Sequence, residues 1–224
     1  MLGNWVPSSR DRFTAADFCF LSDVLAPGEG GQALARLWDD PQAIREMLDL
    51  KEVLRAVLGA SRALEISASF YFYVLVRHAF VQAGLGDEAL ADYVAGVLAE
   101  RVSPVPDDTA KAVAEGLAYA ADFQAVMETA PAAMRFFLQV AAGNRFLVLT
   151  GMYAGFLERR AERRGAPGVE FYEGFARRVF REAADNRQAP ADAPRRLLGE
   201  LAEALPCARR SLNRVAEEFV FLGE

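Results

Sequence analysis

Two pairs of adjacent polar residues interrupt the most apolar stretches of the chain, and they are its best candidates for chemistry. Arg77 and His78 follow the run FYFYVLV. Asn144 and Arg145 lie between the runs FFLQVAAG and FLVLTGM. Tyr153 adds a hydroxyl directly after the second stretch. Apolar walls with a few convergent polar groups are typical of small-molecule sites. These five residues therefore predict one polar pocket within an apolar helical protein.

The same residues also fit a structural role, because an arginine buried without a partner would cost several kcal/mol. In this alternative, Arg77 and Arg145 reach the edge of the bundle or pair with carboxylates. The candidate carboxylates are Glu65, Asp122 and Glu158. His78 would then be a core histidine with satisfied hydrogen bonds, and the sequence leaves both interpretations open.

His78 is the only histidine of the chain, which limits the metal and cofactor chemistry that can be expected. A di-iron carboxylate site needs a Glu-x-x-His motif on each of two helices, but position 75 is Leu75. A zinc site would need carboxylates or the two distant cysteines, Cys19 and Cys207, beside this single histidine. Axial ligation of haem by His78 is the remaining alternative, but isolated histidines in a core are more often structural than ligands. We therefore expect no metal and no cofactor.

The elements that must position these residues are helices, because no Asn-Gly or Asp-Gly turn joins two alternating segments. Helix starts are marked by Thr14, by Asp40 followed by Pro41, by Asp49 and by Asp87. The helices expected from such signals and from apolar periodicity are about 14–26, 32–38, 41–48, 49–58, 67–82, 87–101, 109–129, 131–164, 169–186, 194–204 and 206–221. Without the short segment at 32–38 these are ten helices, so the fold class is all-α, a bundle of about eight to ten helices.

Two of these helices, about 67–82 and 131–164, are apolar on almost every face, so other helices are expected to surround them. We expect the two to be central and to pack against each other. Gly151 and Gly155 in the second form a GxxxG pair, which lets another helix approach closely. The helix over about 87–101 is instead expected to be amphipathic. Its apolar stripe consists of Leu90, Tyr93, Val94 and Val97.

A proline-rich segment, SPVPDD at 103–108, is the clearest linker in the chain. Each half of the chain holds one very apolar helix that it would struggle to bury alone. We therefore expect a single helical domain over 1–224, with an internal linker at 103–108.

Composition excludes some classes of partner. The net charge of −6 argues against nucleic acid as the main partner. Lysine occurs only at Lys51 and Lys111, so 23 of the 25 basic residues are arginine, which is typical of a GC-rich genome. Four arginines gather in one segment, where two glutamates partly neutralise them. They are Arg159, Arg160, Arg163 and Arg164, interleaved with Glu158 and Glu162.

Arginines near the middle of the longest apolar stretches argue against a membrane span. The N-terminal sequence has no basic segment followed by an apolar one, so no signal peptide is expected. We therefore expect a soluble protein in the cytoplasm.

Three functions are compatible with these residues. The one we favour is a non-enzymatic helical protein that acts as a homo-oligomer or binds another protein, since no catalytic motif accompanies the apolar excess. The C-terminal run Phe219–Leu222 could dock on a neighbouring chain. The second is a binder of a hydrophobic small molecule with a polar head group, held between the two central helices. The third is an enzyme in which His78 and a carboxylate work as acid and base.

Overall fold

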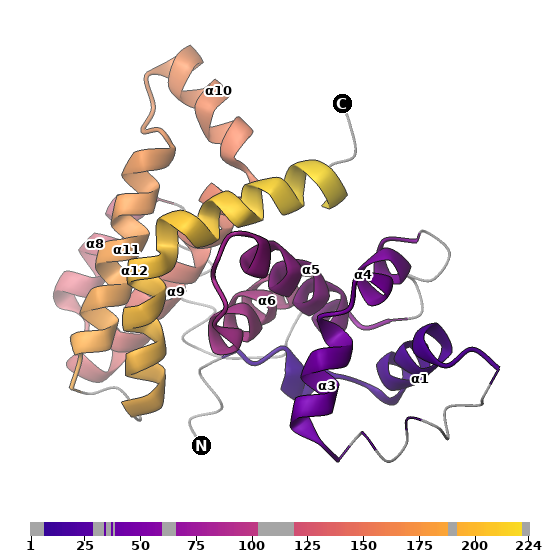
Figure 1. Ribbon diagram of the computed structural model, residues 1–224. Helices are drawn as coiled ribbons and strands as arrows, with labels where there is room; N and C mark the ends of the chain where they lie inside the picture. Colours follow the sequence, from indigo (N-terminus) through magenta and orange to yellow (C-terminus); the bar gives the residue numbers. More distant parts are fainter. Residues whose placement is uncertain are drawn as a thin grey trace. The chain divides into compact units, whose positions relative to one another are not determined.

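The computed structural model describes residues 7–28, 34, 37, 39–59, 66–102, 119–187 and 192–220. Within these ranges it contains ten α-helices and no strand, which confirms the all-α prediction (Figure 1). The chain forms two compact units, unit 1 over Met1–Pro104 and unit 2 over Val105–Glu224. The expected linker at 103–108 lies outside the described residues, as do Glu65 and most of the expected helix 32–38. Whether the two units form one domain stays a prediction.

Unit 1 contains five α-helices among its described residues, and capping side chains begin three of them where the sequence predicts. Thr14 and Asp17 form a capping box, and the carboxylate of Asp40 accepts from a backbone N–H with Pro41 in the first turn. Asp87 accepts from two backbone N–H groups of the next helix. The elements are η1 Arg10–Arg12, α1 Ala15–Leu25, α3 Pro41–Leu48, α4 Lys51–Leu58, α5 Ala68–Gln82 and α6 Glu88–Val102.

The core of unit 1 is the pair α5 and α6, which pack against each other. The expectation of an amphipathic α6 is wrong, because every residue from Leu90 to Ala99 is buried. Small side chains explain how neighbours reach all its faces. At Gly96, the backbone oxygen of Pro7 lies 2.8 Å from where a Cβ would stand. Sequence periodicity marks the stripe of large apolar residues but misses this burial of small ones.

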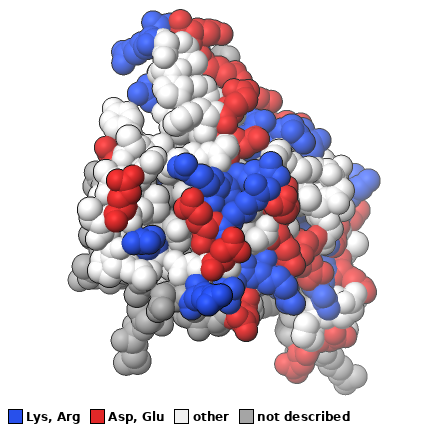
Figure 2. All heavy atoms as spheres, turned by 90° about the vertical axis from the view of Figure 1, so that its left-hand side faces the viewer, with Lys and Arg blue, Asp and Glu red and all other residues white. Residues whose placement is uncertain are grey.

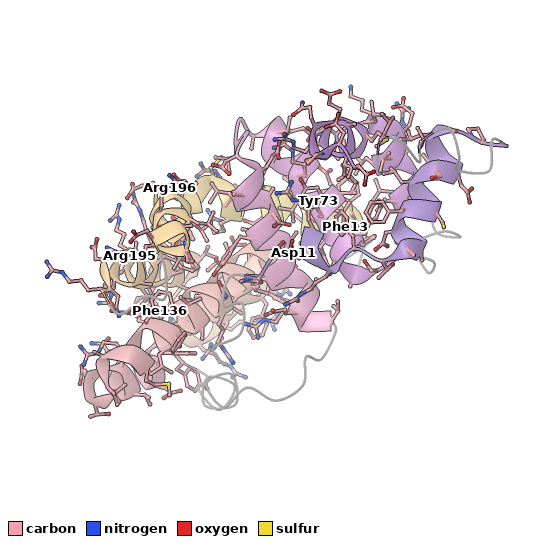
Figure 3. The ribbon with its side chains drawn as sticks, turned by 90° about the horizontal axis from the view of Figure 1, so that it is seen from below. Asp11, Phe13, Tyr73, Phe136, Arg195 and Arg196 are labelled. Carbon is pink, nitrogen blue, oxygen red and sulfur yellow. The ribbon has the colours of Figure 1, made fainter. Side chains whose placement is uncertain are left out.

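The carboxylate of Asp17 is fully buried and joins the start of α1 to the start of α5. It accepts from the backbone N–H and the hydroxyl of Ser67, both at 2.7 Å. It also accepts from the backbone N–H and the hydroxyl of Thr14, at 2.7 and 3.0 Å. Four donors satisfy a group whose burial would otherwise be costly. Nearby, Phe13 packs edge-on against Tyr73 with ring centroids 5.7 Å apart (Figure 3).

Unit 2 is organised around α9, which packs against α8, α11 and α12. Its polar residues Gln139 and Thr150 are buried, and the Thr150 hydroxyl bonds back to a carbonyl of its own helix. At Gly143, a Cβ would stand 2.5–2.7 Å from ring atoms of Phe180, so glycine lets α11 approach closely. The elements are α8 Ala120–Thr129, α9 Ala132–Met152, α10 Ala154–Arg164, α11 Val169–Asp185, α12 Asp192–Val215 and the π-helical η2 Ala216–Val220.

The single helix expected over 131–164 is broken at Tyr153, where φ is −127° and ψ is 33°. Of the GxxxG pair, only Gly151 makes a close approach. A Cβ there would stand 2.8 Å from a methyl carbon of Leu212 on α12. Gly155 lies beyond the break, at the start of α10, and is exposed. The break therefore separates the two glycines into different helices.

The break expected at Pro206 is absent, because α12 continues through this proline as a helix. Proline lacks the N–H that would bond to the carbonyl of Ala202 four residues earlier. Arg177 of α11 supplies the missing donor, with its Nε 3.2 Å from that carbonyl oxygen. Figure 1 shows that α12 changes direction part-way along, as a helix with an internal proline commonly does.

Other arginines also donate to carbonyls at the ends of helices, which lack donors of their own. Arg195, near the start of α12 (Figure 3), donates from Nε to Ala184 O at the end of α11, at 2.9 Å. Arg135 of α9 donates to Ala130 O, which follows α8, at 3.1 Å. Part of the arginine content thus satisfies the backbone.

Candidate functional site

Arg77 of α5 is 8% exposed, and a carboxylate partner holds it in place. Its Nε and Nη2 donate to the two carboxylate oxygens of Asp49, both at 2.8 Å. Its Nη1 donates to the carbonyl of Gly86 at 2.7 Å. The hydrogen bond to Asp49 raises the pKa of the guanidinium, so the charge is permanent. Every nitrogen of this guanidinium group is engaged, which leaves it little capacity to bind a ligand.

Asp49 therefore has a different role from the one that its position predicts. The N-cap of α4 is Leu50, whose side chain makes no capping hydrogen bond. Asp49 ends α3 instead, and its carboxylate turns to Arg77 of α5. The strong bidentate pair outcompetes a local cap. The sequence gives no local signal for this pair, because 28 residues separate Asp49 from Arg77.

His78 is half-buried next to Arg77 and contacts the end of α3. Its Nε2 lies 3.1 Å from the carbonyl oxygen of Leu48, so this nitrogen carries the proton and donates. Burial lowers the pKa of the imidazole, so the ring is neutral near pH 7. Among the described residues, no carboxylate is hydrogen-bonded to the ring. The contacts of His78 are those of a side chain that fastens two helices.

A second polar cluster of unit 1 was not found in the sequence. The backbone N–H of Arg10 donates to Asp92 at 2.8 Å, and its guanidinium lies 5.8 Å from the ring centroid of Tyr73. Glu88 pairs with both Arg10 and Arg45, at 3.5 and 3.3 Å. Burial raises the pKa of Tyr73 to about 12, so its phenol stays neutral. These residues come from separate segments of unit 1, and no local motif links them.

The remaining predicted site residues, Asn144, Arg145 and Tyr153, lie in unit 2. The first two are half-buried on α9, and Tyr153 is 47% exposed between α9 and α10. No ion pair between described residues joins Arg145 to Asp122 or to Glu158 of unit 2. Since Arg77 and His78 belong to unit 1, a pocket shared by all five residues stays a prediction.

The junction of α9 and α10 is held by a side-chain amide that sequence reasoning missed. Asn213 of α12 donates from Nδ2 to the carbonyls of Thr150 and Gly151, at 2.9 and 2.6 Å. Arg209 donates to the Asn213 carbonyl oxygen at 2.8 Å and pairs with Glu173 of α11. This chain of contacts links three helices at Tyr153.

Of the four exposed large aromatic side chains among the described residues of unit 2, three lie on or next to α10. Phe156 and Arg160 are four residues apart and so share one side of α10, and Tyr153 directly precedes this helix. The guanidinium of Arg160 also lies 5.7 Å from the ring centroid of Tyr119. We call these four residues the α10 face. Its three aromatic residues are 47–53% exposed.

Only Leu157 of α10 is fully buried, so the helix has a small anchor. Figure 1 shows α10 rising at the top of the view, beside the upper end of α11. On the face that Figure 2 displays, basic and acidic side chains are interleaved. The pairs of Arg177 and Arg181 with Glu203 follow this pattern. The α10 face instead holds three exposed aromatic rings.

The described residues offer little for a metal or a redox bond. No group of three or more His, Cys, Asp or Glu side chains in the described ranges could hold a metal ion. Cys19 is exposed and Cys207 is half-buried, and no disulfide joins cysteines of the described ranges. None of the helices in the described part is long and apolar enough to cross a membrane.

Comparisons with known proteins give no family for this chain. No protein-family model, no curated protein and no solved structure matches it. The functional argument therefore rests on the geometry of its own residues.

Proposed function

We propose that this chain is a non-enzymatic helical protein that acts by self-association through the α10 face. The observation that carries the proposal is the exposure of Tyr119, Tyr153 and Phe156, together with the position of Arg160 over the ring of Tyr119. Aromatic residues and arginine are the types most enriched in the energetic centres of protein interfaces. An enclosed core would bury such rings, whereas an interface needs them at the surface.

A second copy of the chain is the partner that fits the order of residues along α10. The exposed rings of Tyr153 and Phe156 lie at its N-terminal end, and arginines fill the C-terminal half to Arg164. An antiparallel pair of α10 helices, related by a two-fold axis, would set each aromatic half against the arginine half of its partner. The Arg160–Tyr119 contact is an example of the same arginine-to-ring attraction within one chain.

Neither alternative function gains support from the contacts of its residues. A ligand head group would need a polar group with free capacity, whereas Arg77 is engaged by Asp49 and Gly86. An acid–base role would need a carboxylate on His78, whose Nε2 instead contacts a backbone carbonyl. The proposal includes the expected cytoplasmic location, with neither nucleic acid nor a cofactor as a partner.

Sedimentation velocity of the full chain over the micromolar range tests the proposal. We expect a monomer–dimer equilibrium, and a clean monomer at every concentration would refute it. In a two-fold dimer each substitution acts twice, so Phe156→Ser removes two cation–π contacts of about 0.5–1 kcal/mol each. Dimer affinity should fall about 5- to 30-fold.

Phe171→Ser is the matched control for this experiment. Phe171 and Phe156 are both 53% exposed, but Phe171 lies on α11 outside the α10 face. Its substitution removes the same apolar area from the surface and should leave dimer affinity unchanged. Equal losses in the two variants would show that apolar area anywhere on unit 2, and not the α10 face, drives association.

A further inference from the structure

The junction between α9 and α10 points to regulation of the α10 face, an inference that rests on the proposed self-association. We propose that Tyr153 is a joint with two positions. In the structure the joint is bent, and in the other position α9 and α10 form one continuous, straight helix. The amide of Asn213 holds the bent position. Straightening carries Tyr153, Phe156 and Arg160 away from Tyr119 and so takes the α10 face apart.

The backbone around Tyr153 is one residue away from a continuous helix. Helical bonds reach the joint from both sides, with Tyr153 N–H donating to Leu149 O at 3.1 Å and Tyr153 O accepting from Leu157 N–H at 3.2 Å. Only Tyr153 itself has dihedral angles outside the helix. No proline lies within α9 or α10 to prevent the straight form. The sequence pattern itself predicts one helix over 131–164.

The side chain of Asn213 replaces two of the backbone N–H donors that the bend removes. In a continuous helix, the carbonyls of Thr150 and Gly151 would accept from the N–H groups of Ala154 and Gly155. In the bent form, both carbonyls accept from Asn213 Nδ2 instead. The glycine at 151 lets α12 come close enough, with Leu212 against its Cα. One amide on α12 thus stands in for two backbone donors.

Opposing interactions stabilise the two positions. The bent form keeps Leu157 buried and the amide of Asn213 satisfied. The straight form exposes Leu157 but forms three backbone hydrogen bonds at the joint, from the N–H groups of Ala154, Gly155 and Phe156. Arg209 and Glu173 orient the amide from α12 and α11, so a change in their contacts would be felt at the joint. Such a balance is the condition for a switch.

Distance measurements between two spin labels test the joint directly. The labels are placed on Ala132→Cys and Glu162→Cys, both exposed, in a Cys19→Ser and Cys207→Ala background. A continuous helix separates these positions by about 45 Å, at about 1.5 Å per residue. We expect a shorter distance in the parent protein. Asn213→Asp, which sets a carboxylate against two carbonyl oxygens, should move most of the population to the long distance.

Asn186→Asp is the matched control, since it makes the same change on another part-buried amide of unit 2, 3.3 Å from Gln139. Its distance distribution should equal that of the parent. If Asn213→Asp does not fold, Tyr153→Ala tests the joint in its place, because alanine favours the helix at this position and leaves Asn213 unchanged. A folded Asn213→Asp or Tyr153→Ala variant with only the short distance would overturn the joint.

The outcome is separate from that of the self-association experiment. A long distance in Asn213→Asp together with a parent protein that stays monomeric keeps the joint and rejects the proposed function. A dimer whose affinity is unchanged in a straightened variant keeps self-association and rejects regulation by the joint.

Discussion

The pair of Arg77 and Asp49 allows a prediction in which the size of the stability loss depends on which partner is removed. The side chain of Arg77 is 9% exposed and that of Asp49 is 39% exposed. Asp49→Ala leaves a buried cation with one remaining carbonyl partner, whereas Arg77→Met leaves a carboxylate that water can reach. Breaking a buried pair from one side costs about 3–5 kcal/mol. We expect about 3 kcal/mol for Asp49→Ala and about 1–2 kcal/mol for Arg77→Met.

The double variant separates the pair from its surroundings. With both charges absent, no uncompensated charge remains, and Arg77→Met keeps apolar volume at the site. The combined loss should be about 1–2 kcal/mol, well below the sum of the single losses. Glu52→Ala is the control, because Glu52 and Arg55 form an exposed pair with side chains 61% and 74% exposed. It should change stability by less than about 0.5 kcal/mol.

Urea unfolding followed by tryptophan fluorescence measures these changes. Trp5 and Trp38, the only tryptophans, both fall within unit 1, so the signal reports the unit that holds the pair. With a slope of about 2 kcal/mol per molar, a loss of 3 kcal/mol lowers the midpoint by about 1.5 M. Additive single losses, or a larger loss in Arg77→Met than in Asp49→Ala, would contradict this account of burial.

Three further predictions concern other parts of the structure. Gly143→Ala should destabilise unit 2 by about 1–3 kcal/mol, because the new methyl group would overlap the ring of Phe180 on α11. Gly174→Ala has open space around it and should stabilise α11 by about 0.5–1 kcal/mol. Circular dichroism during heating compares the two variants. Arg177→Ala should cost about 1 kcal/mol in the parent but less beside Pro206→Ala, which restores the backbone donor; urea unfolding measures both backgrounds. Burial lowers the pKa of His78 in the folded state, so the unfolded chain binds the proton more tightly. As the pH falls below about 6.5, the parent protein should therefore lose stability relative to His78→Gln. Nuclear magnetic resonance of the single imidazole checks the pKa.

Local signals explain what the sequence could predict about the fold. Thr14, Asp40 and Asp87 cap helices because each carboxylate or hydroxyl lies two or three residues from the N–H groups that it satisfies. Such contacts need no tertiary structure, so periodicity and capping residues suffice to identify the helices. The all-α class follows from them.

The features that sequence analysis got wrong depend on side chains from distant elements. The proline of α12 does not end its helix because Arg177 supplies a donor from α11. The helix over 131–164 breaks at Tyr153, where Asn213 satisfies the carbonyls of Thr150 and Gly151. Asp49 leaves its local cap for Arg77. In each case a hydrogen bond across 25 residues or more decides between two locally acceptable structures.

The arginine that spans α11 and α12 restricts which mutations the chain can accept over evolutionary time. Arg177 uses Nε for the carbonyl of Ala202 and Nη2 for Glu203, and lysine has one nitrogen where this geometry needs two. A change to lysine at this position would cost less stability once Pro206 had been lost, because the backbone N–H of the new residue would then serve the carbonyl of Ala202. The cost of each mutation would thus depend on which came first. Structure as well as nucleotide composition therefore favours arginine at this position.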